Sequence, residues 1–144
     1  MMRHSTIEQE LERQGHSFFQ TVGDSMEPLL HNRKSTVVIA KAPEKLRKYD
    51  VALYHRPTGE YVLHRVIKVR ESDYLICGDN RIYREKVPRE WVIGVMTGFF
   101  SDAGSQFVAC EDGRYQEYVR VLTRRYGIRW VKALPGRIRR KLIR

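Results

Sequence analysis

The sequence lacks any long hydrophobic run, and it contains few cysteines. No apolar stretch approaches the ~20 residues of a membrane-spanning helix. The N-terminus has neither the basic start nor the apolar segment of an export signal. The two cysteines, Cys77 and Cys110, lack the spacing of metal ligands, and buried reduced thiols are their expected state. The sequence therefore predicts a cytoplasmic protein with no metal and no cofactor.

A globular composition is present over 144 residues, of which 42% are hydrophobic and 31% charged. This length and composition predict one folded domain and exclude a disordered chain. The net charge of +10 is unevenly distributed, because residues 114–144 hold eleven Lys and Arg but one acid. The other 113 residues hold sixteen bases and sixteen acids. A neutral body thus carries a basic tail, and the two need separate explanations.

The pattern predicts a helix followed by short strands. Residues 5–14 favour a helix, since Ser5 or Thr6 can cap it and Gly15 can end it. From residue 17 onward, short β-branched and aromatic runs are separated by turn residues. The expected strands are 18–22, 36–40, 50–55, 60–69, 73–77, 91–100 and 106–110, with hairpin turns at 56–59 and 101–105.

These elements indicate a mainly β fold, a small coiled antiparallel sheet or barrel with a short N-terminal helix and a basic helical C-terminal tail. The expected organisation is an N-terminal helix over 1–16, a β domain over 17–112 and a basic amphipathic tail over 113–144.

The tail is predicted to be helical, with interruptions at Gly127 and at 135–136. Its interleaved basic and apolar residues suit an anionic membrane surface, and they equally suit packing on its own domain with a solvated basic face. Binding to nucleic acid is the least favoured of these three interpretations. The residues expected to meet a membrane or another anion are Arg124, Arg125, Arg129, Trp130, Lys132, Arg137, Arg139, Arg140 and Lys141.

The stretch from Thr21 to Leu30 has Ser25 near its centre. Gly23 lets the backbone bend sharply before the serine, and Pro28 presets φ for a helical turn after it. A strand, a sharp turn and a helical turn would present the hydroxyl beside unpaired backbone N–H groups, as a nucleophile with an oxyanion site requires. By itself, the stretch also suits a turn whose serine caps a helix.

A nucleophilic Ser25 needs a proton acceptor, and His64 on the expected strand 60–69 is the best candidate. An imidazole has an ordinary pKa near 6.5, whereas a lysine must be buried to act as a base at neutral pH. Asp79, at the end of strand 73–77, and Glu85 are the candidates for a carboxylate that orients the ring. The other candidate bases are His31, His55 and several lysines.

Four segments resemble, in order and rough spacing, the S24/S26 serine peptidases, a group that contains the type I signal peptidases and the self-cleaving SOS-response repressors. They are Gly23–Pro28, Tyr49–Tyr54, Leu63–Ile67 and Ile76–Asn80, and the resemblance covers about residues 18–100. Bacterial signal peptidases and the repressors have a catalytic lysine where this chain has His64. The chain therefore resembles the Ser-His branch, which contains the endoplasmic-reticulum-type and archaeal-like enzymes.

The resemblance implies a serine endopeptidase with Ser25 as nucleophile and His64 as general base. It implies that Asp79 or Glu85 orients the imidazole. Bacterial signal peptidases often have a hydroxyl at the position of Gly23, so here the oxyanion hole would rest on backbone N–H groups, including that of Ser25.

The chain also departs from the family pattern. Glu85 stands where the family has an aspartate, Tyr49 replaces a glycine, and a signal peptidase's membrane anchor is missing. The expected substrate is an extended peptide or protein precursor with small residues before the cut, such as the leader of a small peptide processed at the inner membrane surface. The alternative is a catalytically inactive peptide- or membrane-binding module with the same fold. A nucleic-acid-linked regulator is disfavoured, because no DNA-binding domain is visible.

Overall fold

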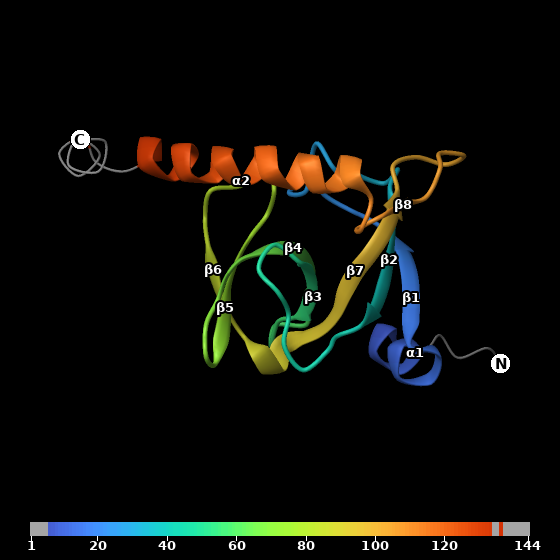
Figure 1. Cartoon of the computed structure of the whole chain (residues 1–144). Helices are drawn as coiled ribbons and strands as arrows, with labels where there is room; N and C mark the ends of the chain where they lie inside the picture. The colour runs from blue at the N-terminus through green and yellow to red at the C-terminus, as the bar shows by residue number, and fades with distance from the viewer. Residues whose placement is uncertain (1–5, 134–135, 137–144) are drawn as a thin grey trace. The chain divides into compact units, whose positions relative to one another are not determined.

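Eight antiparallel strands in one open sheet and two α-helices make up the part of the chain that the structure describes, residues 6–133 and 136 (Figure 1). The structure is a computed structural model. The chain divides into two compact units, Met1–Cys110 and Glu111–Arg144. The mainly β fold predicted from the sequence is confirmed. The N-terminal helix, expected as a separate segment, belongs to the same unit as the sheet.

Helix α1 (Ile7–Gln14) begins and ends where the sequence predicts. The Thr6 hydroxyl accepts a hydrogen bond from the backbone N–H of Gln9 (3.1 Å), and the Gln9 side chain accepts one from the N–H of Thr6 (3.0 Å). Gly15 ends the helix in the left-handed region at φ 79°. Because Leu11 is buried, the helix is held to the sheet as well as capped.

The sheet has the order β1-β2-β7-β3-β4-β5-β6, and β8 pairs with β7. All of these pairings are antiparallel. A short 3₁₀ helix, η1 (Arg89–Trp91), precedes β7. The strand bounds are β1 (His16–Gln20), β2 (Thr36–Lys41), β3 (Val51–His55), β4 (Tyr61–Val69), β5 (Asp73–Cys77), β6 (Glu85–Pro88), β7 (Val92–Phe100) and β8 (Val108–Ala109).

Strand β3 lies between β7 and β4, so its residues 51–54 are buried on both faces. Tyr54 is part of the hydrophobic core formed with residues of β4, β5 and β6. In the register of β3 with β4, Ala52 lies opposite His64. A buried central strand therefore holds β4, the strand that carries the candidate base His64.

The sequence pattern did not predict β6. This strand has four residues and one buried side chain, Val87, and it contains Pro88. It lies at the edge of the sheet, where a proline and exposed polar residues are tolerated. Its pairing with β5 places Glu85 opposite Ile76.

Helix α2 runs over Gly113–Ala133 without a break, so the predicted interruption at Gly127 is wrong. A glycine inside a helix costs only about 1 kcal/mol, which a long helix tolerates. Neither described helix is long and apolar enough to cross a membrane.

Two of the nine tail residues predicted to meet an anion, Arg124 and Arg125, are exposed. The other seven lie outside the residues whose side chains the structure describes: Arg129, Trp130, Lys132, Arg137, Arg139, Arg140 and Lys141.

Candidate active site

Ser25 lies in an irregular turn that follows β1. No regular helix begins at Pro28, because residues 23–30 form turns and bends, but the backbone bond from Leu30 to Met26 closes one helical turn around it. Backbone hydrogen bonds from Glu27 to Asp24 (3.0 Å) and from Leu30 to Met26 (2.9 Å) hold the turn. Met26 and Leu30 are also buried. This single turn and its buried apolar side chains position the Ser25 hydroxyl.

Gly23 allows the sharp bend before Ser25. Its φ is +97°, a conformation that side-chain-bearing residues rarely adopt. Its N–H donates to Oδ1 of Asn32 (2.8 Å), so this group is already engaged. Among the described residues, the N–H of Ser25 has no hydrogen-bond partner. Of the two positions predicted to form the oxyanion site, Ser25 therefore has a backbone N–H that can donate to an oxyanion. Gly23 instead provides the backbone bend before it.

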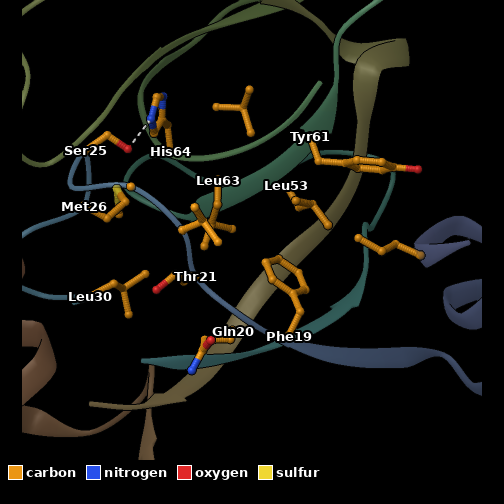
Figure 2. A pocket seen from close by; sticks show the side chains of 14 residues that line it. Phe19, Gln20, Thr21, Ser25, Met26, Leu30, Leu53, Tyr61, Leu63 and His64 are labelled. Carbon is orange, nitrogen blue, oxygen red and sulfur yellow. Dashed lines mark hydrogen bonds between the residues drawn. The ribbon is translucent and has the colours of Figure 1, made fainter. Parts of the chain in front are cut away.

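Ser25 and His64, 39 positions apart in the sequence, are in direct contact. The Ser25 hydroxyl Oγ lies 2.8 Å from Nε2 of His64 (Figure 2). This is the distance expected for a nucleophile and its general base. For Nε2 to accept a hydrogen bond from the Ser25 hydroxyl, the neutral ring of His64 carries its proton on Nδ1.

The surroundings of His64 favour the neutral imidazole. Burial lowers its pKa to about 4, and the positive charge of Arg56 acts in the same direction. The carboxylates of Glu85 and Asp79 oppose this shift without reversing it. At neutral pH the ring is therefore uncharged and can accept the proton of the Ser25 hydroxyl.

Asp79 forms a buried ion pair with Arg65. Its two carboxylate oxygens lie 2.8 Å from Nε and 2.9 Å from Nη2 of the guanidinium, and both side chains are fully buried. Arg65 also donates to the carbonyl of Tyr49 (2.9 Å). Tyr49 has φ +75°, a conformation that residues other than glycine rarely adopt. Arg65, on β4, thus joins Asp79 to the loop before β3.

The segment Gly78–Asn80 packs against the turn that carries Ser25. The Asn80 N–H donates to the carbonyl of Ser25 (2.8 Å), and its side chain contacts the carbonyl of Asp24 (3.3 Å). A Cβ on Gly78 would lie 2.7 Å from the same Ser25 carbonyl, so only glycine fits. Sequence reasoning missed this supporting role, although the glycine next to Asp79 was a signal of close backbone approach.

Glu85 forms a second, less buried cluster near the imidazole. Its carboxylate accepts hydrogen bonds from the Tyr54 hydroxyl (2.7 Å) and from Nε and Nη2 of Arg56 (3.0 and 2.7 Å). Burial would raise the pKa of Glu85, but these hydrogen bonds hold it below its ordinary value. The Tyr54 ring meets His64 edge-on, with centroids 6.5 Å apart.

Neither predicted carboxylate contacts the ring. Among the residues that the structure describes, no carboxylate forms a hydrogen bond with His64. Asp79 and Glu85 are each held by an arginine instead. A charge-assisted, bidentate arginine contact is stronger than a neutral hydrogen bond to an imidazole, which explains the difference from the sequence-based expectation. Both acids act on His64 through their charge.

A cavity of about 350 Å³ opens beside the Ser25–His64 pair. Its walls come from α1, from β1 and the turn after it, and from β3 and β4 (Figure 2). The lining residues are Ile7, Phe19, Gln20, Thr21, Val22, Gly23, Ser25, Met26, Leu30, Leu53, Tyr61, Val62, Leu63 and His64. A mostly apolar cavity with one hydroxyl–imidazole pair is the usual form of a ligand or substrate site.

Comparison with known protein families and with curated proteins gives no match to this chain.

Proposed function

We propose that the protein is a serine endopeptidase of the S24/S26, signal-peptidase-like type. The observation that supports this most strongly is the 2.8 Å contact between Ser25 Oγ and His64 Nε2 in the wall of an apolar cavity. Burial lowers the pKa of His64, so the imidazole is neutral at pH 7, the form that a general base must have.

In the proposed reaction, Ser25 Oγ attacks the carbonyl carbon of a peptide bond while His64 Nε2 accepts the hydroxyl proton. The N–H of Ser25 donates to the developing oxyanion. His64 then gives the proton to the leaving amine, the C–N bond breaks, and an ester joins the substrate to Ser25. A water molecule, deprotonated by His64, hydrolyses this ester and restores the hydroxyl.

The proposed substrate is an extended peptide in a precursor. Strand β5 pairs with β4 from Arg65 onward, so in the described structure Tyr61–His64 pair with β3 alone. These residues line the cavity, so a peptide can add to this strand edge with its scissile carbonyl near Ser25. The resemblance further suggests small residues before the cut. A leader removed at the inner face of a membrane is the setting that we propose.

One observation favours a second candidate, a peptide-binding module without catalysis. Neither Asp79 nor Glu85 contacts His64 among the described residues, so the imidazole lacks the orienting partner of a typical triad. Such a module would bind peptides in the same cavity and leave them intact.

The decisive experiment incubates wild type, Ser25→Ala and His64→Ala with a pool of synthetic peptides and follows cleavage by mass spectrometry. Loss of either residue should lower the rate by about 10⁴–10⁶-fold. The matched control is Ser72→Ala, which changes an exposed serine outside the cavity and should retain wild-type cleavage.

A fluorophosphonate probe gives an independent readout, because it reacts with an activated serine and should label Ser25 in wild type. Equal cleavage by all variants contradicts the proposed function. Peptide binding by wild type with neither cleavage nor labelling favours the non-catalytic module.

A further inference from the structure

Helix α1 contributes a residue to the cavity, although none of its residues belongs to the Ser25–His64 pair. Its first residue, Ile7, lines the same cavity as the Ser25–His64 pair. Sequence reasoning assigned this helix no functional role. Its position in the wall of the candidate site means that it helps to define the space available to a ligand.

A set of polar contacts holds α1 against the β3–β4 hairpin. The Tyr61 hydroxyl donates to Oε2 of Glu8 (2.8 Å), and Nδ1 of His55 lies 3.1 Å from Oε1 of the same carboxylate. The rings of His55 and Tyr61 are stacked, with centroids 4.2 Å apart and planes within 7°. Glu8 therefore joins α1 to Tyr61, and both Tyr61 and Ile7 line the cavity.

Tyr61 lies at a defined distance from the Ser25–His64 pair. Tyr61 precedes His64 by three residues on β4, and a strand rises about 3.3 Å per residue, so the two are separated by ~10 Å along the strand. In Figure 2, Ser25 and His64 lie at one side of the cavity, and Tyr61 lies at the other, toward the helix. A peptide extended beside β4 reaches Tyr61 about three residues from the bond at Ser25.

The far end of the cavity is apolar and only partly covered. Ile7, Phe19 and Leu63 are half-buried, and Tyr61 is 41% exposed. Leu53 is buried beneath them. These side chains keep apolar surface that a ligand can remove from water, which favours a large aliphatic or aromatic side chain over a charged one.

We propose that α1 and Tyr61 form a specificity subsite for a large apolar side chain of the substrate, about three residues from the bond that is cleaved and beyond the small residues expected directly before the cut. This inference rests on the proposed peptidase function and adds the class of side chain that the substrate carries. Ile7 sets the depth of the subsite, and Glu8 is a positioning residue that acts through Tyr61.

The test measures a ratio of two kcat/KM values for each variant. A lower amount of folded protein reduces both values equally and therefore leaves the ratio unchanged. Cleavage of a random peptide pool by wild type identifies the bond and should show Leu, Met, Phe or Ile enriched about three residues from it. Two peptides that differ only there, with Phe or Ala, then give a ratio of kcat/KM. Ile7→Trp should lower the Phe/Ala ratio about tenfold by filling the subsite, and Ile7→Ala should raise preference for Trp over Leu at that position.

Glu12→Ala is the matched control, because Glu12 lies on the same helix, is exposed, pairs with Lys41 (2.7 Å) and does not line this cavity. It should keep the wild-type ratio. If wild type cleaves peptides but the Ile7 variants leave both preferences unchanged, the subsite is overturned and the peptidase function stands. If wild type neither cleaves a peptide nor is labelled at Ser25, the peptidase function fails, and the subsite fails with it.

Discussion

Asp79 and Glu85 both act on His64 through their charge, each is paired with an arginine, and the two pairs differ in burial. The Asp79–Arg65 pair is fully buried, with both side chains at 0% exposure. In the Glu85–Arg56 pair the side chains are 20% and 30% exposed, and Arg56 shares its charge with Glu60. The two acids were equal candidates in the sequence, but only the structure distinguishes their surroundings.

The difference in burial gives the two pairs different roles. A buried bidentate pair has one geometry, because leaving either charge alone in the interior is costly. It therefore holds β4 and the segment Gly78–Asn80, which in turn supports Ser25. The more exposed pair costs less to rearrange and contributes mainly an electrostatic field around the imidazole.

The largest expected effect comes from Asp79→Ala, which leaves the guanidinium of Arg65 buried without its counter-charge. We expect the free energy of unfolding to fall by about 3–5 kcal/mol, measured by urea denaturation. The matched change in the other pair, Glu85→Ala, should cost about 1 kcal/mol, because that pair reaches solvent.

A double variant separates charge from packing in the buried pair. Asp79→Leu combined with Arg65→Met removes both charges and should recover part of the stability lost in Asp79→Ala. Equal losses for Asp79→Ala and Glu85→Ala would remove the distinction drawn between the two pairs.

The second effect is a pH dependence of stability that originates at His64, the residue on which both carboxylates act. Its pKa is about 4 in the folded protein and near 6.5 when unfolded, so the unfolded chain binds more protons between these values. The free energy of unfolding should therefore fall as the pH is lowered from 6.5 to 4, by up to about 1.4 kcal/mol per pH unit.

His64→Gln lacks the titrating group and should lose this part of the pH dependence, which denaturation midpoints at several pH values will measure. Parallel pH profiles for wild type and His64→Gln would contradict a depressed pKa. His16→Gln, at an exposed histidine on β1, is the control and should keep the wild-type profile.

The smallest effect is a pair of opposite shifts in the pKa of His64. Glu85→Gln removes a negative charge that raises this pKa and should lower it further. Arg56→Gln removes a positive charge that lowers it and should raise it. Imidazole chemical shifts over a pH titration measure both, and salt should weaken each effect because the pair is partly exposed. Shifts in the same direction for the two variants would rule out the proposed electrostatic role.

Elements with strong local signals were predictable. Helix α1 follows from its cap at Thr6 and its stop at Gly15, and strand β5 matches the predicted range 73–77. Strand β6 was missed because its single buried residue, Val87, leaves no alternating pattern to detect. The break expected at Gly127 did not occur, because one glycine is a small cost beside the rest of a long helix.

For the candidate site, the sequence by itself determined which residue types are available: a serine after a glycine bend, a histidine on a strand, and two acids downstream. Only the tertiary structure decided their partners. The sheet register and the turn after β1 bring Ser25 to His64. Arg65 on β4 pairs with Asp79, and Arg56 in the turn after β3 pairs with Glu85. Local propensity acts over a few residues, whereas these contacts join residues 14 to 39 positions apart. Such pairings depend on packing and on competition between charged partners, which no local pattern in a single sequence encodes.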